Sequence, residues 1–274
     1  MNTKEKSAIK KIPSITKIKL EYSNFQIYRE HSEKLAETRG LFLADGEKVV
    51  DRLLNSSLEI LEIICLEKYL TSEFLEKVSF HPEVQKIWLG SKEELKTIRG
   101  YELHQGIMAL AKVPNLSEFP NFGPVLVCNN ILEANNIGSL IRSAVALGIN
   151  QMILDTKSCH PFIRRTVRVS VGNIFQMKFF RSSNLFLTLR KLQSQGYTIV
   201  GTVSNNVTDS RLISLNNFFP ISKTTIVLGN EDSGIEKDIL DLCNILINIP
   251  MQEEVDSLNV AVAGAIIMSR YLFQ

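Results

Sequence analysis

The chain has 274 residues, of which 45% are hydrophobic and 22% charged, and its formal net charge is +2. This composition is typical of a soluble globular protein with one large domain or two ordinary ones. No apolar run is long enough to span a bilayer, and the N-terminus lacks a signal-peptide pattern, so we expect a cytoplasmic protein without membrane contact.

The cysteines and histidines are scattered, and none of them has the spacing of metal ligands. We therefore expect no structural metal site. Cys65, Cys128 and Cys243 lie in apolar runs, which predicts buried thiols and fits a reducing compartment.

The N-terminal residues 1–20 carry six lysines and a single glutamate, a local charge of +5 on an otherwise near-neutral chain. We expect this segment to be a flexible basic arm. Such an arm suits contact with phosphates, but the same composition fits a solvated tail, and the sequence leaves both interpretations open.

A small α/β domain is predicted over residues 21–113. Its expected helices are 22–39, 47–54, 67–77 and 91–98, and its expected strands are 58–66, 84–89 and 106–113. Ser91, with Glu94 three residues later, has the pattern of a capping box. Residues 114–124 contain three prolines and a glycine, which predicts a linker.

From residue 125 to residue 274, strands alternate with helices. The expected strands are 125–130, 151–154, 175–180, 197–203, 224–228 and 245–249, and the expected helices are 138–147, 183–195, 236–243 and 257–273. This alternation predicts a mostly parallel sheet with helices on both faces. Ligands of such sheets bind beyond the carboxyl ends of the strands.

Three segments lie at those strand ends, and the first to consider is 229–235 (GNEDSGI). A glycine directly after a strand allows a sharp turn and a close approach to a ligand. The segment lacks the lysine and the spacing of a phosphate-binding loop. Taken alone, it is equally consistent with an ordinary turn before a helix.

The second segment is 133–144 (EANNIGSLIRSA), which follows a predicted strand. Asn136 and Gly138 are expected at a helix start, where free N–H groups attract anions. Arg142 follows about one turn later, and its guanidinium could hold a phosphate. A helix cap followed by a surface arginine is the alternative interpretation.

The third segment is 249–263 (IPMQEEVDSLNVAVA). Ser257 is the predicted N-cap of a helix that is apolar on nearly every side, so the helix must be covered by the domain or by a second subunit. Asn259 is the polar exception in the first turn and needs a partner. A capped core helix accounts for the same pattern.

In this order, the three segments resemble the three motifs of the SpoU (TrmH-type) RNA ribose 2′-O-methyltransferases. The matching residues are Glu133, Asn136, Gly138, Arg142 and Ala144, then Gly229, Glu231 and Gly234, then 249–251 and 257–260. The resemblance covers residues 125–274, including 168–175 between the motifs. Glu133-Ala134 departs from the family's usual Asp-Pro, which bears on substrate fit. Residues 42–49 are similar to a pattern in the family's N-terminal domain.

The resemblance implies a C-terminal trefoil-knotted domain, preceded by a small ribosomal-protein-like α/β substrate-binding domain, in a homodimer. It implies the cofactor S-adenosylmethionine, bound through Gly229, Ile249 and Leu258, with an added contact from Thr202. Arg142 would act as the base or as a positioning group. The residues expected to hold it and the loops are Asn136, Glu231, Ser257 and Asn259. Arg164, Arg165 and Arg168 would contact phosphates or form a solvated surface.

The implied reaction is methylation of a ribose 2′-hydroxyl in structured RNA, with ribosomal RNA expected and transfer RNA as the alternative. A non-catalytic RNA-binding protein of the same fold is a second hypothesis. A nucleotide-binding enzyme with a doubly wound sheet is a third, although the dinucleotide and phosphate-loop signatures are missing. Neither the RNA nor the modified nucleotide can be identified from the sequence.

Overall fold

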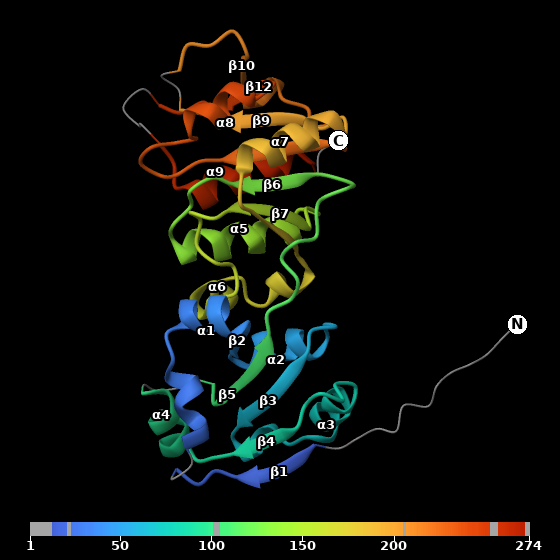
Figure 1. Ribbon diagram of the computed structural model, residues 1–274, viewed down its shortest axis with the longest axis vertical. Coiled ribbons are helices and arrows are strands. Elements are labelled where there is room, and N and C mark those ends of the chain that lie inside the picture. The colour runs from blue at the N-terminus through green and yellow to red at the C-terminus, as the bar shows by residue number, and fades with distance from the viewer. Residues whose placement is uncertain (1–12, 21–22, 101–104, 205–206, 253–256, 272–274) are drawn as a thin grey trace, which may run out of the picture. The chain divides into compact units, whose positions relative to one another are not determined.

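The computed structural model describes residues 13–20, 23–100, 105–204, 207–252 and 257–271. The chain divides into two compact units (Figure 1). The N-terminal unit consists of Met1–Val113 with Phe162–Arg168, and the C-terminal unit of Pro114–Pro161 with Val169–Gln274. Within the described ranges, no helix is long and apolar enough to cross a membrane.

The N-terminal unit is built on a five-stranded mixed sheet. In spatial order the strands are β1 (Ser14–Lys17), β4 (Lys86–Leu89), β3 (Ile60–Cys65), β5 (Ile107–Lys112) and β2 (Leu41–Asp45). The first three run parallel, and β5 runs antiparallel to both of its neighbours. The helices are α1 (Ser32–Arg39), α2 (Glu47–Leu54), α3 (Ser72–Ser79) and α4 (Lys92–Arg99), with 3-10 helices η1 (Ser23–Arg29) and η2 (Glu67–Tyr69).

Several predictions for this unit are confirmed, and three are wrong. Helix α2 has the predicted bounds, and Ser91 and Glu94 form the predicted capping box. The expected helices 22–39 and 67–77 are each divided into a 3-10 helix and an α-helix. Strand β1 lies inside the expected flexible arm, because pairing with β4 satisfies main-chain groups that β4 would otherwise expose. Residues 1–12 of that arm lie outside the described residues.

Helix α6 (Arg164–Val169) was not predicted, and most of it belongs to the N-terminal unit. Arg164 donates a hydrogen bond to the buried carboxylate of Asp45. Arg99 forms a two-pronged pair with the same carboxylate, with N–O distances of 2.5 and 2.6 Å. Asp45 therefore joins residues that are far apart in the chain into one unit.

The C-terminal unit contains a seven-stranded sheet in which every pair of neighbours is parallel. The spatial order is β10 (Leu212–Ser214), β12 (Ile245–Asn248), β9 (Thr198–Thr202), β11 (Thr224–Leu228), β6 (Val125–Cys128), β7 (Gln151–Asp155) and β8 (Lys178–Ser182). The main helices are α5 (Ala134–Ala146), α7 (Leu185–Ser194), α8 (Lys237–Leu242) and α9 (Val260–Met268). The predicted α/β class is confirmed, although β10 was not predicted.

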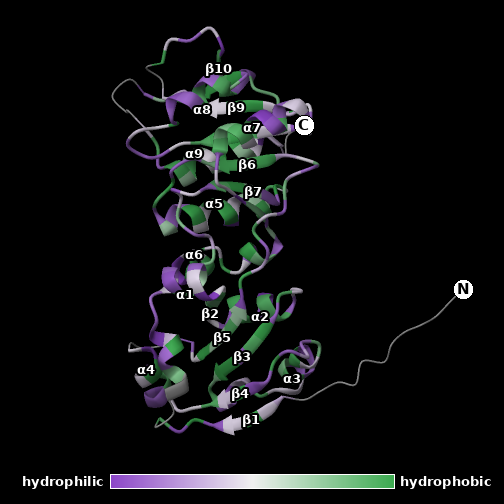
Figure 2. Cartoon of the chain, in the orientation of Figure 1, coloured by the Kyte–Doolittle hydropathy of each residue, from purple (hydrophilic) through white to green (hydrophobic). Residues whose placement is uncertain are grey.

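Helices cover both faces of this sheet, as expected. Leu189 of α7 and Ile239 of α8 share one hydrophobic cluster with Val127 and Val227 of the strands. On the opposite face, α9 packs closely against α5 and β11 at Gly264, where an added Cβ would lie 2.5 Å from the Leu140 side chain. Figure 2 shows β6 and α9 as largely hydrophobic, in agreement with these positions.

The expected linker 114–124 is part of the C-terminal unit rather than a free connection. Ser117 forms an isolated bridge with Phe180, and the ring of Phe119 packs against the Phe180 ring with centroids 5.1 Å apart. The three prolines thus shape a segment that packs along β8.

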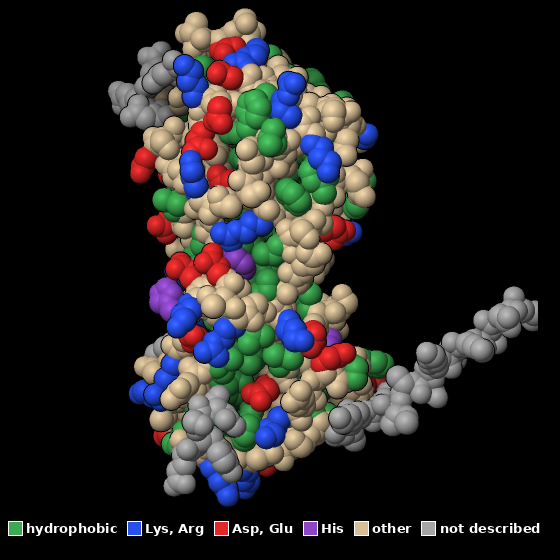
Figure 3. Space-filling view, viewed as in Figure 1, with side chains coloured by type: hydrophobic (Ala, Val, Ile, Leu, Met, Phe, Trp, Pro, Cys, Tyr) green, Lys and Arg blue, Asp and Glu red, His purple; other side chains and the backbone are tan. Residues whose placement is uncertain are grey.

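Figure 3 shows basic and acidic side chains intermixed over the visible face of the C-terminal unit. Cys65, Cys128 and Cys243 are buried free thiols, as predicted.

Candidate active site at the carboxyl ends of the parallel strands

The residues expected to bind the cofactor follow three neighbouring strands of the C-terminal sheet. Thr202 ends β9, Gly229 follows β11 and Ile249 follows β12. In the sheet, β9 lies between β11 and β12, and Thr202 is paired in register with Ile247. The structure therefore brings all three residues to one edge of the sheet, where ligands of parallel sheets bind.

The loop after β11 is closed by its own main chain. Asn230 and Gly234 exchange two hydrogen bonds of 3.0 and 2.9 Å, and Gly234 has a φ of +71°. An added Cβ on Gly229 would lie 2.3 Å from the main-chain atoms of Gly234 and Ile235. This close crossing requires glycine at 229, and the closed loop carries the exposed Glu231.

Helix α5 begins at Ala134, four residues earlier than predicted. Main-chain N–H groups of Asn136 and Ile137 already bond to the Glu133 carbonyl, so the first turn forms before the glycine. Asn136 consequently lies inside the first turn, buried, rather than at the helix end.

Helix α9 is capped by Asn259 rather than by the predicted Ser257. The Asn259 Oδ1 accepts hydrogen bonds from the N–H groups of Ala261 at 3.0 Å and Val262 at 3.3 Å. Ser257 is exposed and has no hydrogen bond with the described part of the chain. Both residues are common caps, so the choice depends on where the preceding loop ends.

A chain of hydrogen bonds joins all three motif segments. Asn259 donates from Nδ2 to the Asn136 Oδ1 at 3.0 Å, and Asn136 donates from its own Nδ2 to the Glu231 Oε1. Asn259 thus has the partner that its position demanded. We call Glu231, Asn136 and Asn259 the motif chain.

Arg142 lies on α5 and is exposed. Within the described residues, its guanidinium has no hydrogen bond or ion pair. Its main-chain carbonyl accepts a hydrogen bond from the Asn173 side chain at 3.3 Å. The motif chain was expected to hold Arg142 in place, but none of its described side chains forms a hydrogen bond with the Arg142 guanidinium. The arrangement leaves five N–H donors available to an anionic ligand.

A second polar network at the same edge was not predicted. The buried carboxylate of Asp155 accepts hydrogen bonds from the Asn129 side chain at 3.0 Å and from the N–H groups of Asn130 and Ser158 at 2.8 and 2.7 Å. Asn129 also bonds to Glu236 through both its amide and its carbonyl group. Polar residues directly after strands β6 and β7 are the signal that could have revealed these residues.

We call Asn129, Asp155, Ser158 and Glu236 the buried network. Hydrogen bonds from Lys157 and then Asn129 lower the pKa of Glu236, so its carboxylate form is favoured. The network ties the loops after β6 and β7 to the start of α8, which follows the Gly229 loop. These hydrogen bonds therefore hold the loops after β6 and β7 and the start of α8 in fixed relative positions.

The chemistry of the strand ends fits a ligand bound through the main chain. Among described residues, the N–H and C=O groups of Gly229 and Leu258 have no hydrogen-bond partner, and the half-buried Thr202 hydroxyl has none either. Polar groups that the fold leaves unpaired at this edge are available to hydrogen-bond a ligand. No cluster of acidic, histidine and cysteine side chains in the described ranges could hold a metal ion.

Comparisons with known proteins agree with this geometry. The model of the SpoU rRNA Methylase family matches residues 123–269. A Staphylococcus epidermidis protein named "Putative TrmH family tRNA/rRNA methyltransferase" is 30% identical over 175 residues, which cover 60% of this chain and 68% of that protein.

Solved structures share the fold over nearly the full length. The AdoMet-bound rRNA methyltransferase from Sinorhizobium meliloti has a TM-score of 0.79 at 19% identity, covering 94% of this chain and 97% of that one. An RNA 2′-O ribose methyltransferase has a TM-score of 0.75 at 21% identity, covering 95% and 99% of the two chains. Because the family model spans more than half of the sequence and includes all three motif segments, this chain belongs to the SpoU rRNA methylase family.

Proposed function

We propose that this protein transfers a methyl group from S-adenosylmethionine to a ribose 2′-hydroxyl of structured RNA, with ribosomal RNA as the expected substrate. The motif chain carries the proposal, because it assembles Glu231, Asn136 and Asn259 from three distant segments at the ligand-binding edge of the sheet. S-adenosylmethionine supplies an already activated methyl group, so positioning accounts for much of the rate acceleration.

The cofactor would be held by groups that the fold leaves unpaired. The main-chain groups of Gly229 and Leu258 bind the polar edges of the adenosine, with Ile249 and the Thr202 hydroxyl beside them. The motif chain fixes the relative positions of the Gly229 loop and the start of α9. A loss of this linkage would separate the two sides of the cofactor pocket.

Arg142 would bind the RNA. Its exposed guanidinium can form a two-pronged contact with a phosphate and orient the ribose next to it. A guanidinium holds its proton in proteins, so we assign Arg142 the positioning of the 2′-hydroxyl rather than its deprotonation. Ser257, exposed just before α9, is available to the same substrate.

The proposed assembly is a homodimer with a trefoil-knotted C-terminal unit. Val262 and Ile266 of α9 are 50% and 37% exposed, and a second copy of the chain would cover these apolar side chains. The N-terminal unit and the basic arm would hold the RNA through shape and phosphate contacts.

The function is tested by incubating the protein with S-adenosylmethionine and either ribosomal or transfer RNA, followed by mass spectrometry of the nucleosides. We expect a 2′-O-methylated nucleoside in ribosomal RNA. Arg142→Ala should abolish methyl transfer without weakening cofactor binding. Arg142→Lys keeps the positive charge but loses the planar guanidinium, so it shows which of the two properties the reaction needs.

Three outcomes would contradict the proposal. Calorimetry without cofactor binding would favour a non-catalytic RNA-binding protein. Methylation of a base would exclude the ribose as the acceptor, and methylation confined to transfer RNA would change the substrate class.

A further inference from the structure

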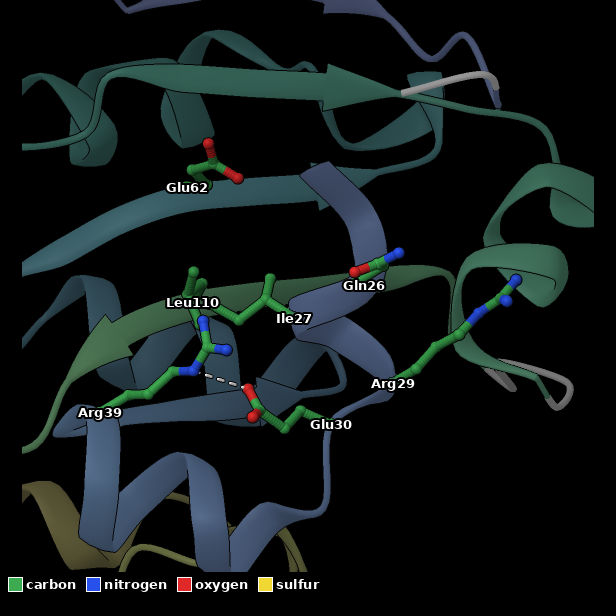
Figure 4. Close-up of a pocket in the computed structure, with 7 residues that line it drawn as sticks. All are labelled: Gln26, Ile27, Arg29, Glu30, Arg39, Glu62 and Leu110. Carbon is green, nitrogen blue, oxygen red and sulfur yellow. Dashed lines mark ion pairs between the residues drawn. The ribbon is translucent and has the colours of Figure 1, made fainter. Parts of the chain in front are cut away.

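A cavity of about 590 Å³ opens in the N-terminal unit, apart from the motif segments. Figure 4 shows its lining residues, which come from η1 and the residue after it, the end of α1, and the strands β3 and β5. Apolar walls are supplied by Ile27 and Leu110, and Glu62 contributes a carboxylate.

Glu62 occupies an unusual position for a carboxylate. It lies on β3, the central strand of the sheet, and shares a face with Ile64, which is completely buried. A charged group at such a position costs folding free energy unless it is hydrogen-bonded. Glu62 is only partly buried and lines the cavity, so its carboxylate is accessible to a ligand bound there.

Only one oxygen of this carboxylate is used by the fold. The Tyr28 hydroxyl donates to Glu62 Oε2 at 2.8 Å, and the Trp88 Nε1–H donates to the same oxygen at 3.2 Å. Within the described part of the chain, Oε1 has no hydrogen-bond partner. Burial, followed by the charge of Glu62, raises the pKa of Tyr28 well above its usual value, so its hydroxyl remains a donor.

Asp45 in the same unit is a buried carboxylate with a structural role, and it differs from Glu62 in its partners. Both of its oxygens are paired, with Arg99 and Arg164. Glu62 has no ion pair with any described residue, although Lys86 is its neighbour in register on β4. The Lys86 ammonium instead lies 4.3 Å from the centroid of the Trp88 ring.

The rim of the cavity carries two arginines, each already bonded on one side, and an amide. Arg29 donates to the Ile98 carbonyl at 3.0 Å, and Arg39 pairs with Glu30 at 2.9 Å. The exposed Gln26 amide has no hydrogen-bond partner among the described residues. An RNA backbone with its phosphates near the two arginines would place a base over the apolar walls.

We propose that this cavity receives an unstacked guanine of the RNA and that Glu62 reads its Watson–Crick edge. A carboxylate accepts hydrogen bonds but cannot donate them, and guanine presents two adjacent donors, N1–H and N2–H₂, on that edge. Adenine, cytosine and uracil each present donors from a single group there. Because Glu62 Oε2 already accepts from Tyr28 and Trp88, the two lone pairs of Oε1 would accept from both guanine groups. This inference rests on the proposed action on RNA.

The test uses the single tryptophan of the chain, Trp88, which donates to Glu62. The full-length protein is titrated with the 5′-monophosphates of guanosine, inosine, adenosine, cytidine and uridine, and Trp88 fluorescence is recorded with correction for nucleotide absorption. We expect guanosine monophosphate to bind at least about tenfold more tightly than the others. Inosine lacks only the N2 amino group and therefore tests this edge without any mutation.

Glu62→Gln is the informative variant, since its amide oxygen can still accept from Tyr28 and Trp88. Its NH₂ group would face the guanine donors, so guanosine monophosphate should bind about tenfold more weakly. Glu33→Gln, at an exposed position of α1 outside the cavity, is the matched control and should bind like the original protein. Far-ultraviolet circular dichroism verifies that both variants are folded.

Equal affinities for guanosine and inosine monophosphates would overturn the inference, as would a Glu62→Gln variant that keeps full guanine affinity. A fluorescence response to arginine amide with none to nucleotides would assign the cavity to basic peptides instead. Cofactor binding, measured by calorimetry on the same samples, should be unaffected by Glu62→Gln. Its absence in the original protein would contradict the proposed function rather than the guanine site.

Discussion

Two polar networks lie at the same edge of the C-terminal sheet, and they differ in exposure. In the buried network, Asn129 is 0% and Asp155 is 6% exposed, whereas Glu231 and Asn259 of the motif chain are both exposed. A hydrogen bond that is shielded from water costs more free energy to lose than one that water can replace. The buried network therefore maintains the loops, and the motif chain is available to a ligand.

The strongest way to disturb both networks is Gly229→Ala, because the new Cβ would meet main-chain atoms of Gly234 and Ile235 at 2.3 Å. The free energy of unfolding should fall by more than ~3 kcal/mol, and cofactor binding should be lost. Gly148→Ala is the control, since its φ is also positive at +81° but open space surrounds the position. This control should lower the free energy of unfolding, measured in urea, by about 1 kcal/mol. Equal losses would show that the crossing at Gly229 is not tight.

Acid should lower the free energy of unfolding through His160, which closely follows Asp155 and Ser158 of the buried network in the chain. Burial, and then the charge of Arg181, lowers the His160 pKa from 6.5 to about 4. The unfolded chain therefore binds a proton at a higher pH than the folded chain, and stability present above pH 6.5 is lost as the pH falls towards 4. The loss should approach ~3 kcal/mol. The free energy of unfolding, measured in urea at several pH values, should depend less steeply on pH in His160→Gln than in the original protein. An unchanged pH dependence would contradict the role of His160.

Asp155→Asn tests the buried network directly. The substitution places an amide group against donors that now face a carboxylate, so the free energy of unfolding should fall by about 2 kcal/mol. Asp238→Asn on the exposed side of α8 should change it by less than ~0.5 kcal/mol. If the two variants unfold alike, Asp155 does not support the loops.

Asn136→Ala tests the motif chain and should have the smallest effect on stability, below about 1 kcal/mol, because its partners remain accessible to water. Methyl transfer should nevertheless slow by roughly tenfold to a hundredfold, since the Gly229 loop and α9 lose their connection. Single-turnover rates with Asn150→Ala, an exposed substitution outside α5, provide the control. A variant that unfolds readily but reacts at the normal rate would reverse the roles of the two networks.

Local sequence was sufficient where an element has clear boundaries. Strand β11 was predicted to the residue, because five β-branched or apolar residues end at Gly229, and α2 was predicted equally well behind Gly46. Strand β1 was missed because three of its four residues are polar within a lysine-rich segment, and its pairing depends on the distant β4. Strand β10 has only three residues, too few for a pattern.

The site required more than local sequence. Asn136 and Asn259 are 123 positions apart, so no spacing rule could pair them, and only the order of the motif segments placed them in one site. The cap at Asn259 rather than Ser257 could not be chosen from the sequence, because both residue types are common N-caps. The early start of α5 was missed because Glu133 precedes the helix without a side-chain cap.

The membership of Phe162–Arg168 in the N-terminal unit has a consequence for dissecting the molecule. The polypeptide passes between the units three times, so a single cut after Val113 cannot release two complete parts. A fragment ending there would keep Asp45 with Arg99 but lose Arg164. The remaining fragment would carry the Phe162 ring without Phe42, its partner at 5.0 Å. Deletion or exchange of the N-terminal unit would therefore have to include two separate segments of chain, Met1–Val113 and Phe162–Arg168.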